Sequence, residues 1–242
     1  STSETFEAGT IVKSGVITTS ADRDFTVKVK VTGLLPFTRY HYQFKAGGYQ
    51  SVSGRTLTAP HPDAEVDRIR FAFTSCQSYP DGYYNVLQVL AQDDVDFCLA
   101  LGDYTYEGGG DQVRPDTISA VSLSTYREKY RLYLTDPNLR EVRRLFPWIC
   151  IWDDHEVYND YAGGDLSDED RERQRAAYQA YREFMPIDPG LPYTEEGGVA
   201  NLQLYRKFTF GTLLEVFALD ERQYRDGQVC PLLYACLLYT SP

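Results

Sequence analysis

The sequence has 242 residues, of which 43% are hydrophobic and 24% charged, so it can build a folded core and is not an intrinsically disordered chain. Its formal net charge of −11 argues against nucleic acid or an anionic membrane as a general partner. A phosphorylated substrate remains compatible with this charge, because bound cations can reverse the local field.

The five cysteines do not have the spacing of a structural zinc site, because no CxxC pair occurs. Cys98 and Cys150 lie inside the apolar runs "FCLAL" and "WICIW". A free cysteine behaves as a small hydrophobic residue, so we expect both to be core thiols.

Residues 1–60 are predicted to form β structure. In "DFTVKVKVTG" (24–33), apolar and polar residues alternate with a period of two, which indicates a strand with one solvated face. Further strands are expected in "RYHYQF" (39–44) and "YQSVSGRTLTAP" (49–60). Short antiparallel strands at this spacing predict a small β-sandwich. We expect residues 61–68 to form a linker.

The pattern changes after the linker to alternating strands and helices. "IRFAFTS" (69–75) and "VDFCLALGD" (95–103) are apolar strands, and the segment 82–94 between them has helical spacing. Such a βαβ unit predicts a parallel sheet. The remaining expected elements are helices at 122–136, 138–146 and 167–185, a third buried strand at 147–152, and two late strands at 202–211 and 213–220.

Three of these strands are followed by polar side chains with metal-binding chemistry. The segments are "SCQ" (75–77), "GDYTYE" (102–107) and "WDDHE" (152–156). Ligands in open α/β sheets bind beyond the carboxyl ends of the strands, where these segments would meet. The convergence predicts a dinuclear metal site.

Taken singly, these residues have ordinary structural explanations. Cys76 alone is more often structural than catalytic, Asp103 after a glycine can cap a turn, and His155 can be a satisfied core histidine. Tyr104 and Tyr106 are also unremarkable in a chain with 20 tyrosines. Only the combination favours the metal site.

The combination resembles the calcineurin-like metallophosphoesterase superfamily, whose motifs are strand-D-x-H, strand-GDxxD and strand-GNHE. Here Ser75-Cys76-Gln77 replaces the first motif, Tyr106 occupies the last position of the second, and Asp154 stands in place of Asn in the third. These departures resemble the PhoD-like alkaline phosphatases. So do the segments "FAFTSCQSYPDGYYN", "LALGDYTYEGG", "IWDDHEVYNDYAG" and "LDERQYRDGQ". Residues 1–60 resemble the fibronectin-type-III-like N-terminal domain of that family.

The resemblance implies an α/β metallophosphatase-type domain, with a parallel-rich sheet flanked by helices, in which residues 69–229 would be the N-terminal half. It implies Fe³⁺ held by Cys76, Asp103 and Tyr106, with Asp103 bridging to Ca²⁺. Asp154 and Asn159 would lie on the calcium side, where oxygen ligands suit a hard cation. His155 would orient or protonate the leaving oxygen, and Glu156 would orient His155 from behind.

The implied reaction is hydrolysis of small or polymeric phosphate esters by a secreted or cell-surface alkaline phosphatase or phosphodiesterase, with a monomer favoured. Two alternatives stay open. One is an inactive, incomplete fragment, because no further metal motif follows "LDERQYRDGQ" and residues 230–242 resemble nothing in the family. The other is a purple-acid-phosphatase-like enzyme, which shares the GDxxY spacing but has Asn before the His of its third motif.

Overall fold

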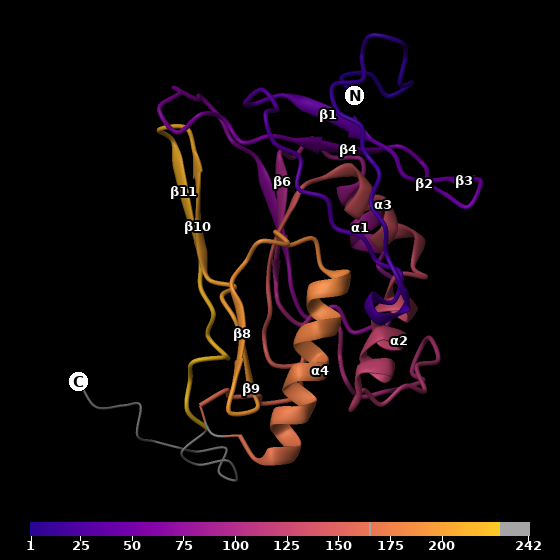
Figure 1. Cartoon of the computed structure of the whole chain (residues 1–242), viewed down its shortest axis with the longest axis vertical. Helices are drawn as coiled ribbons and strands as arrows, with labels where there is room; N and C mark the ends of the chain where they lie inside the picture. Colours follow the sequence, from indigo (N-terminus) through magenta and orange to yellow (C-terminus); the bar gives the residue numbers. More distant parts are fainter. Residues whose placement is uncertain (165, 228–242) are drawn as a thin grey trace.

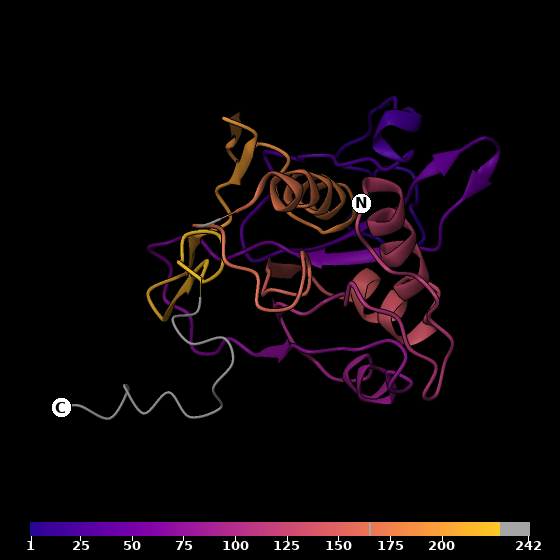
Figure 2. The same cartoon turned by 90° about the horizontal axis from the view of Figure 1, so that it is seen from below.

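The computed structural model describes residues 1–164 and 166–227. It shows a central parallel sheet with helices on one side, a β-hairpin on the other side, and an N-terminal β region across one end (Figures 1 and 2). The predicted tail 230–242 lies outside the described residues. In the described part of the chain, no helix is both long and apolar enough to span a membrane.

Three parallel strands form the sheet that was predicted from the apolar runs. They are β5 (Phe71–Thr74), β6 (Phe97–Leu101) and β7 (Trp148–Ile151), in the order β5-β6-β7. Ala72 pairs with Cys98, and Ala100 pairs with Cys150. The prediction of a parallel sheet is therefore confirmed.

Alternate residues of these strands enter two different cores. Cys98 and Cys150, both buried free thiols as expected, face the larger core under the helices. Phe97 and Ile149 point the other way and pack with the hairpin of β10 (Arg206–Phe210) and β11 (Leu214–Ala218). The rings of Phe97 and Phe210 stack there, with 4.5 Å between their centroids. The period of two along each strand thus separates the two cores.

Three of the four described α-helices begin at a residue whose side chain accepts from a first-turn backbone N–H, whereas the short helix at 85–90 has no such side-chain cap. Ser122 forms a capping box with Thr125, and Asp136 accepts from the N–H groups of Asn138 and Leu139. Ser167 caps the last helix, whose first turn is acidic and so suits the helix dipole. The helices are α1 (Asn85–Leu90), α2 (Leu123–Tyr133), α3 (Pro137–Leu145) and α4 (Asp168–Phe184).

Buried tyrosines make up much of the larger core. Tyr126, Tyr130 and Tyr133 of α2 and Tyr178 and Tyr181 of α4 are at most 1% exposed. Tyr178 stacks on Trp152, the residue after β7, at 4.2 Å between centroids. Helices α2 and α4 therefore hold the start of the third motif loop from behind.

The N-terminal region contains small antiparallel sheets. β1 (Arg39–Tyr42) pairs with β4 (Gly54–Leu57), and β2 (Lys45–Ala46) pairs with β3 (Tyr49–Gln50). The strand expected over 49–60 is thus divided between β3 and β4. A further hairpin, of β8 (Tyr193–Glu196) and β9 (Val199–Leu202), follows α4. The strand expected at 202–211 is shorter in the structure, where Leu202 ends β9 and residues 206–210 form β10.

The prediction of a strand over 24–33 is wrong, because no described strand pairs with this segment. The expected burial of the apolar face is also wrong, whereas Lys30 and Thr32 of the polar face are exposed as expected. Lys28 Nζ donates to the Met185 carbonyl, and Lys30 Nζ lies 2.6 Å from Asp188 Oδ2. The apolar side chains point outward instead, and Phe25 is 68% exposed. Alternation alone predicted a strand, but a strand needs a partner to satisfy its backbone groups.

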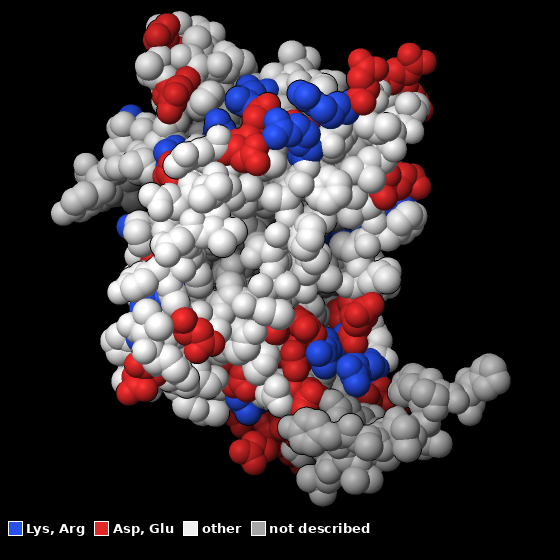
Figure 3. Space-filling model, turned by 180° about the vertical axis from the view of Figure 1, so that it is seen from behind, with Lys and Arg blue, Asp and Glu red and all other residues white. Residues whose placement is uncertain are grey.

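β5 is less buried than its apolar sequence predicts. It is an end strand of the sheet, and its Phe73 is 70% exposed. In α1, Val86 is 79% exposed, whereas Leu87 is buried. Figure 3 shows the back of the molecule, where a broad band without charged groups separates charged clusters at the two ends.

Candidate metal centre

The loops that follow β5, β6 and β7 are joined by backbone contacts at the carboxyl ends of the strands. The N–H of Cys76 donates to the Gly102 carbonyl at 3.3 Å, and that of Gln77 donates to the Asp103 carbonyl at 3.1 Å. A Cβ on Gly102 would lie 2.2 Å from the Asp153 backbone nitrogen. The second loop therefore needs glycine where it passes the third.

Cys76 and Asp103 at this edge have a left-handed backbone although neither is a glycine. Cys76 has a φ of 54° and Asp103 a φ of 52°. This conformation costs free energy for residues with a side chain and is concentrated at functional sites. This backbone conformation directs the side chains of Cys76 and Asp103 toward each other at the carboxyl edge of the sheet.

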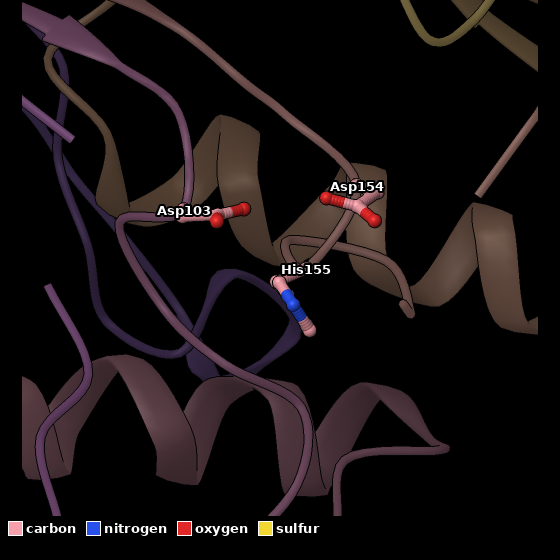
Figure 4. A group of neighbouring side chains, drawn as sticks. All are labelled: Asp103, Asp154 and His155. Atoms are coloured by element: carbon pink, nitrogen blue, oxygen red, sulfur yellow. The ribbon is translucent and has the colours of Figure 1, made fainter. Parts of the chain in front are cut away.

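Asp103, Asp154 and His155 form the group that could hold a cation, as Figure 4 shows. Each offers one ligand atom, and these atoms lie within 4.8 Å of one another. The two carboxylates are nearly buried, with Asp103 6% and Asp154 5% exposed. Asp103 Oδ1 is buried and has no hydrogen-bond partner among the described residues. A buried carboxylate oxygen without a donor is satisfied by a metal ion, so this geometry fits a cation.

Cys76 and Tyr106 also meet Asp103. The Tyr106 hydroxyl donates to Asp103 Oδ2 at 3.0 Å, and the Cys76 thiol interacts with both residues. Burial and the neighbouring Asp103 raise the pKa of Tyr106, and burial raises that of Cys76. Burial also raises the pKa of Asp103. Metal binding would require the thiol of Cys76 and the phenol of Tyr106 to release their protons.

The structure corrects the expected role of Glu156. Glu156 Oε1 accepts from the Tyr104 N–H at 2.6 Å, and Oε2 accepts from the N–H groups of Asp103 and Asp153 at 3.2 and 2.9 Å. The carboxyl group thus holds the second and third loops together and does not orient His155. Burial raises the pKa of Glu156 to about 8, although the backbone donors oppose this rise.

The partner of His155 is Glu107, which the sequence did not reveal. His155 Nδ1 lies 2.7 Å from Glu107 Oε2. Burial disfavours the imidazolium, but the hydrogen bond and charge of Glu107 outweigh it and raise the pKa of His155. Glu107 is the last residue of the segment "GDYTYE" that was expected at the site, but no role was predicted for it.

Asn159 lies beside this contact. Its backbone N–H donates to Glu107 Oε1 at 2.8 Å, and its side-chain amide donates to Asp160 Oδ2 at 2.9 Å. These contacts place its loop at the site, and its role as a calcium ligand stays a prediction.

Arg222 is a second residue that the sequence did not single out. Its Nε donates to Asp153 Oδ1, and its Nη2 lies 3.4 Å from Asp154 Oδ1. It belongs to the "LDERQYRDGQ" segment, which is held close because Gly163 donates to the Arg222 carbonyl at 2.9 Å. The guanidinium offsets the charge of carboxylates that would otherwise repel one another.

Comparisons with known proteins agree with this geometry. The family model described as "PhoD-like phosphatase" matches residues 71–240, and the model of its N-terminal domain matches residues 1–60. The chain is 38% identical to "Alkaline phosphatase D" of Bacillus subtilis (strain 168), over 90% of this chain and 39% of that protein. The solved "Structure of PhoD" superposes with a TM-score of 0.78 at 40% identity, covering 84% of this chain and 41% of that one. The chain thus spans about two fifths of the length of these relatives.

Proposed function

The chain belongs to the PhoD-like phosphatase family, and on this premise we propose that the whole protein hydrolyses phosphate esters as a metal-dependent alkaline phosphatase or phosphodiesterase. The observation that carries the proposal is the cluster of Asp103, Asp154 and His155 at the carboxyl edge of the parallel sheet, in which the two carboxylates would hold a cation and His155 would stay free for proton transfer. The family match favours this enzyme class over the purple-acid-phosphatase-like alternative.

The donor set supports iron and calcium as the metals. The thiolate sulfur of Cys76 and the phenolate oxygen of Tyr106, together with the carboxylate of Asp103, suit Fe³⁺. The oxygens of Asp103, Asp154 and Asn159 suit Ca²⁺. When bound, such cations neutralise charge on the phosphoryl oxygens during an in-line attack.

The remaining roles belong to side chains of the chain itself. His155 would donate a proton to the leaving oxygen, and its contact with Glu107 would hold the imidazole for this role. Glu156 keeps the second and third loops together through backbone N–H groups. Arg222 holds Asp153 and Asp154 in place beside the cluster.

The domain division and cellular location form part of this proposal. We propose a β-sandwich domain of the fibronectin type III kind at residues 1–60, a linker at 61–68 and the first half of the metallophosphatase domain at 69–229. The matches of two separate family models to the two parts support this division. The family resemblance also supports a secreted or cell-surface enzyme that acts as a monomer on small or polymeric esters.

The test is metal content and turnover of the full-length protein. Elemental analysis should find iron and calcium, and nitrophenyl phosphate or its diester should be cleaved at alkaline pH. Asp103→Ala should remove the metal and lower turnover by more than about 100-fold. Mutating a residue that only hydrogen-bonds to a metal ligand already lowers metal affinity or activity by about 10- to 100-fold, and a ligand itself should matter more. Asp67→Ala, in the exposed linker, is the control. Full turnover in the Asp103→Ala variant would refute the site, and the same assay on residues 1–242 alone tests the inactive-fragment alternative.

A further inference from the structure

Glu107 uses its two carboxylate oxygens for two different parts of the third loop. Oε2 lies 2.7 Å from His155 Nδ1, and Oε1 accepts the backbone N–H of Asn159 at 2.8 Å. The side chain is only 16% exposed, and that of His155 is 20% exposed. One carboxylate thus fixes both the imidazole and the chain four residues further on.

The contact determines which ring nitrogen faces the site. An ionised carboxylate can only accept hydrogen bonds, so the neutral imidazole carries its proton on Nδ1. The Asn159 N–H donates to one oxygen of Glu107 and His155 Nδ1 lies within hydrogen-bond distance of the other, which is the arrangement of a carboxylate that accepts through both oxygens. Nε2 is then the nitrogen left to exchange a proton. The Tyr106 ring packs against the imidazole at 4.2 Å between centroids and limits its rotation.

Buried contacts hold the loop that carries Glu107. The Glu107 carbonyl accepts from the Ala120 N–H at 2.8 Å. The fully buried Lys129 of α2 donates to the carbonyls of Gly108 and Ile118 and to Asp116 Oδ2, at 2.8, 2.7 and 2.6 Å. The carboxylate is therefore placed before any substrate binds, which is what a positioning group requires.

We propose that Glu107 is a positioning residue that holds the His155 imidazole with Nε2 toward the reacting phosphate ester and fixes the Asn159 loop beside it. This inference rests on the proposed hydrolase function. As water forms the new P–O bond and the ester P–O bond breaks, the Nε2 proton passes to the leaving oxygen. A proton released by the attacking water restores the imidazolium. Glu107 itself neither gains nor loses a proton in this step.

The kinetic test compares two esters in the full-length enzyme. Nitrophenolate leaves without a proton, whereas an alkoxide needs one. Glu107→Ala should lower kcat for an alkyl phosphate by 10- to 100-fold, the range typical of groups behind an active-site residue. The loss for nitrophenyl phosphate should be smaller, and KM should change little. A merely structural role would lower both rates equally, and that result, or wild-type rates for both esters, would overturn the proposal.

Two variants sharpen this test. Glu107→Gln keeps the shape but has only one acceptor oxygen, so it can satisfy one of the two N–H groups and should lose less than Glu107→Ala. Glu172→Ala, on the exposed face of α4, is the matched control and should behave as wild type.

A crystal structure of the Glu107→Ala variant tests the inference without any activity. The His155 ring should leave its place against Tyr106, whereas it should stay in Glu107→Gln. An unmoved ring in Glu107→Ala would overturn the proposal. If the wild type cleaves neither ester, the proposed function fails, and the ring position in the variant still decides the role of Glu107.

Discussion

Lys129 and Asp116 form an ion pair that is almost completely buried, with 2.6 Å between Nζ and Oδ2 and side chains that are 1% and 0% exposed. The pair closes the loop that leads from the second motif to α2. Removing one partner leaves the other charge buried and unpaired. We therefore expect Lys129→Met to lower the free energy of unfolding by about 3–5 kcal/mol.

Urea unfolding of the variants checks this value. Lys207→Met is the control, because Lys207 and Glu215 form an exposed pair, with both side chains 49% exposed. Such pairs contribute about 0–1 kcal/mol. The double variant Lys129→Met with Asp116→Asn should recover part of the loss, since no bare charge remains. Equal losses for Lys129→Met and Lys207→Met would contradict the burial argument.

The end strand β5 carries an apolar side chain that the described residues leave uncovered. Phe73 is 70% exposed, whereas Phe97 on the neighbouring strand is 2% exposed. An exposed apolar end strand promotes association between chains. We expect Phe73→Ser to reduce self-association of residues 1–242 in light scattering, with stability unchanged to within about 0.5 kcal/mol.

Phe97→Ser is the comparison for that variant. It removes a ring from the stacked core and should cost about 3–5 kcal/mol. If Phe73→Ser destabilises the chain as much as Phe97→Ser in urea unfolding, then Phe73 is covered in solution.

The strands and helices could be predicted because their signals are local. The apolar runs at 97–101 and 148–151 and the helical spacing within 122–136 and 167–185 need only their immediate neighbours in sequence. The segment 24–33 failed because a strand depends on its partner, and no local signal shows whether a partner strand is present. β5 was found but its burial was overestimated, since burial depends on what packs above the sheet.

The sequence could predict those site residues that directly follow the parallel strands. Asp103, Asp154 and His155 meet because three strand ends meet. Their supporting groups could not be predicted: Glu107 and Arg222 lie 48 and 67 residues from His155 in the chain. Glu156 was expected to orient His155 because of its place in the third motif of the resembled family. The tight turn directs its carboxyl group to backbone N–H groups instead.

The carboxyl group of Glu156 should make stability depend on pH. Burial raises its pKa from 4.5 to about 8 in the folded protein. Between these values the folded state keeps a proton that the unfolded state has lost, so stability falls as pH rises. We expect the free energy of unfolding of metal-free protein to decrease from about pH 5 to about pH 8, a window set by this pKa shift.

The Glu156→Gln variant isolates this contribution. Glutamine cannot ionise, so urea unfolding measured across the same pH range should show a shallower decline than in the wild type. The neutral amide keeps one acceptor oxygen for the backbone donors, so the variant should still fold at pH 5. An unchanged slope would assign the pH dependence to other groups.

Arg222 should stabilise the site most when no cation is bound. Its guanidinium contacts Asp153 and lies 3.4 Å from Asp154, next to the two carboxylates that would face a metal. Hydrogen bonds to charged groups contribute about 1.5–3 kcal/mol. We expect Arg222→Ala to lower the unfolding free energy by about 2 kcal/mol in a chelator. The loss should be smaller in excess Ca²⁺, because a bound cation offsets the same negative charge.

Urea unfolding with and without Ca²⁺ measures the difference between the two losses. Arg225→Ala is the control, since the Arg225 contact to this region is made by its backbone carbonyl, which accepts from the Gly164 N–H at 3.0 Å. Arg222→Lys keeps the charge but not the forked donor geometry, so it should retain part of the stability in the chelator. If Arg222→Ala loses the same amount in both conditions, the guanidinium and the cation do not compensate the same carboxylates. Arg222 would then act through packing of the 219–227 segment and not through the charge of the site.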